Sequence, residues 1–190
     1  MPPRFWSSSK TRVSCAYPGR RRARRPPDDA GFLLADLSLS WSHNSATDVA
    51  IVYFDSSALV KLVVDEDASD VAAALWDGAD AVVSSGLAYP EVRAALAAAH
   101  RDERISARSM RKAKEEWEQF WEALAIVESR RSVLVDAGEV AERYRLRGYD
   151  AVHLASALTI PNPHILMAVW DDRLRSAAVE AGLSIAPIQL

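Results

Sequence analysis

The sequence predicts an α/β fold of three layers, in which a mostly parallel sheet of four or five strands is flanked by helices. Two observations predict it. From residue 50 onward, short apolar runs rich in β-branched and aromatic residues alternate with longer segments of helical periodicity. The connections between these segments are short, and no segment repeats another. Such alternation is typical of parallel strands covered by helices, so we expect one domain over residues 50–190.

The expected strands are short and apolar. Residues 50–54 and 165–169 are continuous apolar runs, which are typical of strands buried on both faces. In chain order, the predicted strands are Ala50–Phe54, Ala81–Ser84, Ala125–Val127, Ile165–Val169 and Ser184–Ala186.

The expected helices are bounded by residues that start or stop helical backbone. Pro90 falls in a first turn, where its missing N–H does no harm. Gly148, Pro161 and Gly182 mark helix ends. In chain order, the predicted helices are Ser56–Val64, Ala68–Trp76, Tyr89–His100, Ser106–Leu124, Asp136–Arg147, Asp150–Thr159 and Asp172–Ala181.

The first 50 residues differ from the rest in composition. They carry eight Lys/Arg and four Asp, a net charge of +4, whereas residues 51–190 have a net charge of −7. They also contain five prolines and lack a sustained period, so we expect residues 1–49 to be a largely disordered basic extension. Two interpretations stay open: an arm that binds nucleic acid, or a non-native extension from an upstream start codon.

Cysteine content and hydropathy indicate a cytoplasmic protein with no membrane span. The chain has a single cysteine, Cys15, so it cannot form an internal disulfide framework. No apolar run approaches the roughly 20 residues that a membrane-spanning helix needs. We therefore expect a soluble protein in the reducing cytoplasm.

Four acidic residues stand at the ends of strands or the starts of helices. Asp55 and Asp171 follow predicted strands, whereas Glu91 and Asp150 open predicted helices. Each could simply cap a helix or complement its dipole. Ligands of an open parallel sheet, however, collect outside the carboxyl ends of its strands, so the four side chains can converge on one edge.

Convergence of four carboxylates would require a cation, because like charges repel one another. Oxygen ligands without a cluster of His or Cys suit Mg²⁺, or Mn²⁺, rather than zinc. The pattern therefore predicts a site for a hard divalent cation.

The segments that contain these acids resemble the motifs of PIN-domain ribonucleases. Their order and spacing match, the resemblance covers residues 51–190, and the chain is most similar to the VapC-type toxins of toxin–antitoxin pairs. The four segments are Tyr53–Leu62, Ala88–Leu96, Tyr149–Leu158 and Trp170–Leu174.

This resemblance implies a function and roles for individual residues. It implies a magnesium-dependent endoribonuclease with a metal-binding catalytic quartet of Asp55, Glu91, Asp150 and Asp171. Ser57 would bond a carboxylate or the substrate phosphate. Many members carry Thr where this chain has Val169, so one hydroxyl near the metal is lost.

Further residues near the motifs are candidates for the substrate site or its surroundings. His153 lies one helical turn after Asp150 and either contacts a phosphate, assists proton transfer or is a packed or capping histidine. Asp172 is an additional acid beside the fourth motif. The candidates for offsetting the acidic charge near RNA are Arg93, Arg147 and Arg173.

The resemblance also implies partners: an RNA substrate, a small antitoxin protein and a second copy of the chain in a homodimer. We expect the antitoxin to insert a basic side chain among the carboxylates. The rest of its contacts would be apolar, anchored by Trp117 and Trp121 on the long predicted helix. The same helix offers apolar surface for a homodimer.

Three other interpretations compete with that of a PIN-domain ribonuclease. Response-regulator receivers need a second acid beside the first, and haloacid-dehalogenase-like phosphatases need Asp-x-Asp, but Asp55 is followed by Ser56 and Ser57. The third alternative is a catalytically dead protein-binding module with a PIN fold. Loss of RNA cleavage in EDTA and its recovery with Mg²⁺ would separate the enzyme from the module.

Overall fold

The structure, a computed structural model, describes residues 49–188. The basic extension expected for residues 1–49 lies outside this range except for Val49. The first described strand begins at Ile51, one residue after the change in composition.

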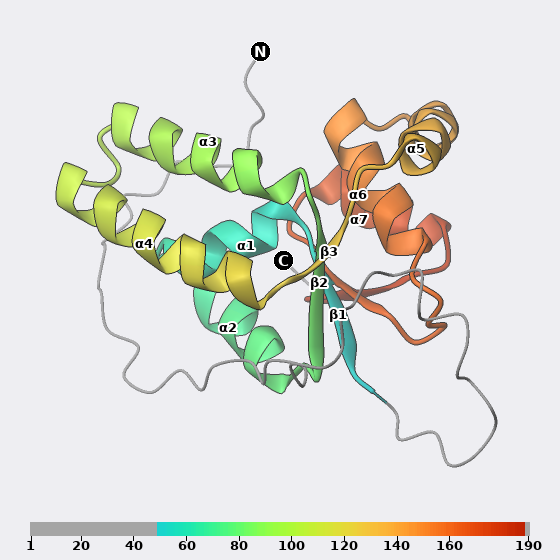
Figure 1. Ribbon diagram of the computed structural model, residues 1–190, viewed down its shortest axis with the longest axis horizontal. Coiled ribbons are helices and arrows are strands. Elements are labelled where there is room, and N and C mark those ends of the chain that lie inside the picture. Colours follow the sequence, from blue (N-terminus) through green and yellow to red (C-terminus); the bar gives the residue numbers. More distant parts are fainter. Residues whose placement is uncertain (1–48, 189–190) are drawn as a thin grey trace.

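A sheet of five strands forms the centre of the domain (Figure 1). The strand order is β3-β2-β1-β4-β5, and every pair is parallel, which confirms the expected α/β fold. The strands are β1 (Ile51–Phe54), β2 (Ala81–Ser85), β3 (Ala125–Val127), β4 (Leu166–Ala168) and β5 (Ser184–Ala186).

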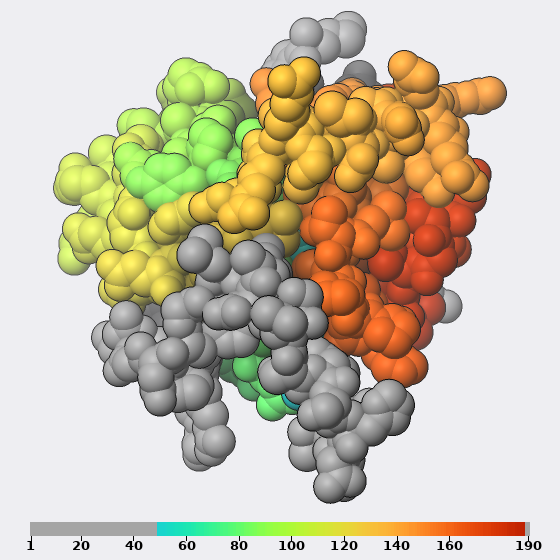
Figure 2. Space-filling model, turned by 45° about the vertical axis from the view of Figure 1, so that its right-hand side comes forward, coloured from blue at the N-terminus to red at the C-terminus, as the bar shows by residue number. Residues whose placement is uncertain are grey.

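Seven helices of the described chain cover the two faces of this sheet. Helices α1 to α4 lie on one face and α5 to α7 on the other, on opposite sides of Figure 1. In Figure 2, α3 and α4 are on the left and α5 to α7 on the right. The helices are α1 (Ser56–Val63), α2 (Ser69–Gly78), α3 (Ala88–Arg101), α4 (Ala107–Ala123), α5 (Arg131–Tyr144), α6 (Gly148–Leu158) and α7 (Asp172–Glu180).

Alternate side chains of the strands build two separate cores. In β1, Val52 and Phe54 pack with the first group of helices, whereas Tyr53 packs with the second. This alternation is the period of two that an extended strand imposes. Because both faces are covered, nearly all residues of β1 are apolar, as the sequence pattern predicted.

One predicted helix has both of its boundaries wrong. The helix expected over Asp136–Arg147 is α5, which runs from Arg131 to Tyr144. Its buried residues begin at Val133, so the apolar stripe starts one turn before Asp136. The helix ends at Arg145, whose left-handed backbone (φ 55°) supplies the C-cap. Gly148 is therefore the first residue of α6 rather than the stop of α5.

The carboxyl ends of β1 and β4 lie side by side and place two of the acids. Phe54 pairs in register with Ala168, and the backbone N–H of Asp55 donates to the carbonyl of Ala168 at 3.2 Å. The chain leaves β4 there and reaches Asp171 three residues later. Among the described helices, none is both long and apolar enough to cross a membrane.

Candidate functional site

Asp55 links the end of β1 to the start of α1. Its carboxylate caps α1 by accepting from the backbone N–H of Ala58 at 2.9 Å, and it accepts the Ser57 hydroxyl at 2.7 Å. Only 2% of Asp55 is exposed. Burial raises its pKa to about 6, with a contribution from the charge of Glu91 and against the opposing effects of His153, Ser57 and Ala58.

Glu91 lies in the first turn of α3 and faces two partners from other elements. Its Oε2 accepts from the hydroxyl of Ser56 and lies 2.8 Å from Nε2 of His153. Burial alone would raise the pKa of Glu91. The hydrogen bond and positive charge of His153 outweigh burial, so the pKa of Glu91 lies below its usual value.

His153 is enclosed and belongs to an internal network. Its Nδ1 lies 2.9 Å from the hydroxyl of Tyr53, and only 2% of the residue is exposed. Burial would lower the pKa of His153, but the hydrogen bond to Glu91 and the charges of Glu91, Asp55 and Asp150 raise it. A protonated imidazole donates at both nitrogens, so Tyr53 and Glu91 together satisfy it.

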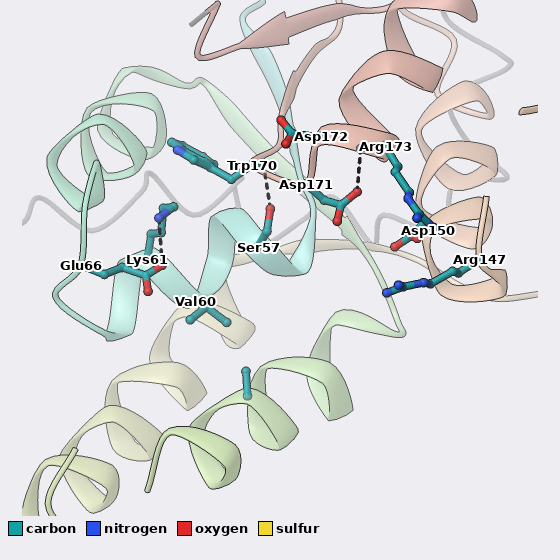
Figure 3. A pocket seen from close by; sticks show the side chains of 11 residues that line it. Ser57, Val60, Lys61, Glu66, Arg147, Asp150, Trp170, Asp171, Asp172 and Arg173 are labelled. Atoms are coloured by element: carbon teal, nitrogen blue, oxygen red, sulfur yellow. Dashed lines mark hydrogen bonds and ion pairs between the residues drawn. The ribbon is translucent and has the colours of Figure 1, made fainter. Parts of the chain in front are cut away.

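Asp150 and Asp171 face an open pocket at the carboxyl edge of the sheet (Figure 3). Asp171 caps α7 by accepting from the N–H groups of Arg173 and Leu174, both at 3.0 Å. Burial and the neighbouring charge of Asp171 raise the pKa of Asp150. The pocket has a volume of about 280 Å³ and is lined by Ser57, Val60, Lys61, Glu66, Ala95, Arg147, Asp150, Trp170, Asp171, Asp172 and Arg173.

The four acids expected to converge are brought together in two layers. Asp55 and Glu91 lie inside with His153, whereas Asp150 and Asp171 line the pocket, and mutual charge effects link Asp150 to both Glu91 and Asp171. Within residues 49–188, no group of three or more His, Cys, Asp or Glu side chains is arranged to hold a metal ion.

Ser57 connects the two layers, as expected of a residue beside the acids. Its hydroxyl donates to Asp55 and accepts from the backbone N–H of Trp170 at 2.8 Å. Asp172 and Arg173 line the pocket as well. His153 does not line it: of its three expected roles, the structure favours the packed histidine, which contacts Glu91 rather than the solvent-open space.

Two expectations about other residues are wrong. Arg93 offers no uncompensated charge to the acids, because it pairs with Glu118 of α4 at 2.8 Å and donates to the hydroxyl of Tyr89. Trp117 cannot anchor a partner, because it is 0% exposed and forms part of the core. The large apolar side chains that the described helices expose lie on α5, α6 and α7, for example Leu134, rather than on α4.

Sequence reasoning missed several residues of the site. Ser56 and Tyr53 complete the network around Glu91 and His153, and Trp170 and Glu66 line the pocket. The sequence carried one signal for Trp170, since a large aromatic residue directly precedes an acid at a strand end. It carried none for Ser56, whose partner Glu91 lies 35 residues away.

The fold and its acidic edge define a class of protein. The family model of the PIN domain matches residues 52–161, which include three of the four acids.

Relatives narrow the class further. Ribonuclease VapC45 of Mycobacterium tuberculosis (strain CDC 1551 / Oshkosh) is 52% identical over 140 residues, 74% of this chain and 97% of its own length. Ribonuclease VapC49 of Mycobacterium tuberculosis (strain ATCC 25618 / H37Rv) matches to the same extent. Ribonuclease VapC46 of the latter strain is 35% identical over 137 residues, 72% of this chain and 97% of its own length. The chain belongs to the PIN-domain family, in its VapC-type branch.

Proposed function

We propose that this protein is a magnesium-dependent endoribonuclease that acts as the toxin of a type II toxin–antitoxin pair. The observation that carries the proposal is a series of pairwise charge effects, between Asp55 and Glu91, between Glu91 and Asp150, and between Asp150 and Asp171, near the carboxyl edge of the sheet. Relatives that cover nearly the same 140 residues bear the name ribonuclease, which supports RNA as the substrate. Asp55, Glu91, Asp150 and Asp171 would hold Mg²⁺, with Mn²⁺ as a functional substitute.

The chemistry of the donor set fits such a cation. All four groups are carboxylates, the ligands that Mg²⁺ prefers. The pKa values of Asp55 and Asp150 are raised by burial and by neighbouring negative charges, so a cation would relieve a real electrostatic cost. Asp150 accepts no hydrogen bond within residues 49–188 and retains its full capacity as a ligand. When bound, Mg²⁺ would make water more acidic and stabilise negative charge on the phosphate.

The chain's own residues prepare this site. Ser57 and the N-terminus of α1 fix the carboxylate of Asp55, and His153 with Ser56 fixes that of Glu91. Because these two carboxylates are already held in place, they need not reorient when negative charge develops on the phosphate during the reaction. Asp150 and Asp171 stand between these inner acids and the pocket, so the substrate would approach from their side.

The test uses the full chain and a fluorescently labelled single-stranded RNA. Cleavage should occur with Mg²⁺ or Mn²⁺, stop in EDTA and return when Mg²⁺ is added. Asp171→Asn should lower the cleavage rate at least 100-fold. Asp136→Asn, which removes an exposed carboxylate of α5, is the matched control and should cleave normally. A protein that binds RNA or another protein but never cleaves would instead be a catalytically dead PIN-fold binding module.

We extend the proposal to the partners in the cell. A cytoplasmic antitoxin, small and carrying a basic side chain, would enter the pocket and neutralise Asp150 and Asp171, since an Arg can bridge two carboxylates. A homodimer would use the exposed apolar residues of α5, including Leu134 and Val135. Expression of the chain should arrest bacterial growth, and an adjacent small gene should restore it. Size-exclusion chromatography with light scattering would measure the oligomeric state.

A further inference from the structure

The pocket at the acidic edge has two chemically different walls (Figure 3). One wall carries the apolar side chains of Trp170, Val60 and Ala95 together with the ion pair of Lys61 and Glu66. The other presents the guanidinium groups of Arg147 and Arg173, and the carboxylates of Asp150 and Asp171 lie beside it. A ligand that fits both walls needs a flat apolar part and an anionic part.

Arg147 and Arg173 are available for an anion. Both are exposed, and neither forms a hydrogen bond through its side chain or an ion pair within residues 49–188. The charge of Arg147 also acts on the neighbouring Asp150, whose pKa it lowers. Arg147 caps the start of α6 and Arg173 is the second residue of α7, so both stand at the mouth of the pocket. Arg93 offers a contrast, because its charge is already compensated by Glu118.

Lys61 lies in the wall that contains Trp170, and its charge is already paired there. Its ammonium bonds Glu66 at 2.9 Å and the carbonyl of Asp67 at 2.7 Å, and its side chain is 10% exposed. The same ammonium lies 5.4 Å from the centroid of the Trp170 ring, a cation–π contact that helps to fix the indole. Lys61 therefore contributes orientation of the aromatic wall rather than a free charge for a phosphate.

We propose that the pocket receives one unpaired nucleotide, with its backbone phosphates on Arg147 and Arg173 and its base stacked against Trp170. This inference rests on the proposed nuclease function, which supplies RNA as the ligand and a cation to neutralise the carboxylates. A volume of about 280 Å³ suits one nucleotide, near the lower end of small-molecule sites (~300 Å³). A base inside a duplex is stacked on its neighbours and cannot offer its face to Trp170.

The experiment measures binding rather than cleavage. A fluorescein-labelled 12-nucleotide RNA and its duplex form are titrated with the full chain, in Ca²⁺ and in EDTA, and anisotropy is recorded at several salt concentrations. Gel electrophoresis of the same samples confirms that the RNA stays intact. The single strand should bind at least 10-fold more tightly than the duplex in Ca²⁺. Equal binding of the two forms would overturn the inference.

Variants test each wall. Arg147→Gln and Arg173→Gln should each reduce the slope of log affinity against log salt by about 0.7, the value for one phosphate contact to a single strand. Arg111→Gln, an exposed arginine on α4 outside the pocket, is the matched control and should leave affinity for the single strand unchanged. An equal change of slope in the control would show that the contacts are not specific to the pocket and would overturn the inference.

The aromatic wall needs a conservative comparison. Trp170→Leu should weaken binding of the single strand about 5- to 150-fold, the range expected for one stacked base, whereas Trp170→Phe should retain most of it. Thermal unfolding by circular dichroism separates loss of stacking from loss of folding. If the RNA is never cleaved but these variants bind as expected, the nuclease proposal is refuted and the nucleotide pocket stands. If RNA is cleaved but substitutions at Arg147, Arg173 and Trp170 leave binding unchanged, the nucleotide pocket is refuted and the nuclease proposal stands.

Discussion

Replacement of Asp55 by Asn should stabilise the protein while it abolishes cleavage. Asp55 is almost completely buried, and burial raises the pKa of its carboxyl from the ordinary 3.8 to about 6. A raised carboxyl pKa means that the folded state favours the neutral form, so stability falls as pH rises through the interval from 3.8 to about 6. Asn is neutral at every pH, and it can still accept the cap bond from Ala58.

The expected gain in the free energy of unfolding follows from the difference between the ordinary and the raised pKa of Asp55. At 1.36 kcal/mol per pH unit, the difference between 3.8 and about 6 corresponds to about 3 kcal/mol at pH 8. Asn has one acceptor oxygen where Asp has two, so weakening of the Ser57 hydrogen bond offsets roughly 1 kcal/mol. The net stabilisation should be about 2 kcal/mol, which raises the melting temperature by about 4–8 °C.

The assay is urea and thermal unfolding of the full chain in EDTA, at pH 4 and at pH 8. The gain should be close to zero at pH 4, where Asp55 is largely protonated in the folded state, and should reach its full size at pH 8. Asp136→Asn removes the same charge from the exposed face of α5 and measures the contribution of net charge alone. A stability gain of the same size at both pH values, or a loss at pH 8, would refute the electrostatic reasoning.

Four further outcomes are expected. Tyr53→Phe leaves a buried nitrogen of His153 without its partner and should cost about 1–3 kcal/mol of unfolding free energy in urea. His153→Gln removes the ion pair with Glu91. The lowered pKa of Glu91 makes the pair stabilise the fold above pH 4.5, and the raised pKa of His153 makes it do so below pH 6.5. Unfolding free energies measured across pH in EDTA should therefore show the largest loss of stability between pH 4.5 and 6.5. Asp150→Asn should lower RNA cleavage at least 100-fold without loss of melting temperature, since it removes one of two neighbouring negative charges. Trp117→Ala should cost about 3–5 kcal/mol of unfolding free energy, and weak destabilisation would show that Trp117 is not core.

The local pattern of the sequence determined the order of strands and helices. A few neighbouring residues are enough to recognise the apolar runs of β1 and β4 and the periodic segments between them. Whether a segment forms a strand or a helix therefore follows from the local spacing of its apolar residues. The same local signals placed Asp55 and Asp171 after strands, and a parallel sheet then puts them at one edge. The end of α5 escaped this reasoning, because Arg145 adopts a left-handed conformation that Gly usually adopts.

Only the tertiary structure decided which side chains meet. Glu91 and His153 are 62 residues apart, and their contact depends on how α3 and α6 are rotated against the sheet from opposite faces. The packing of α4 likewise placed Trp117 in the core, and the packing of α6 and the segment after β4 placed Arg147 and Trp170 in the lining of one pocket. Helical periodicity gives the apolar face of a helix but not the neighbour that this face meets, because that neighbour is chosen by the packing of all layers together.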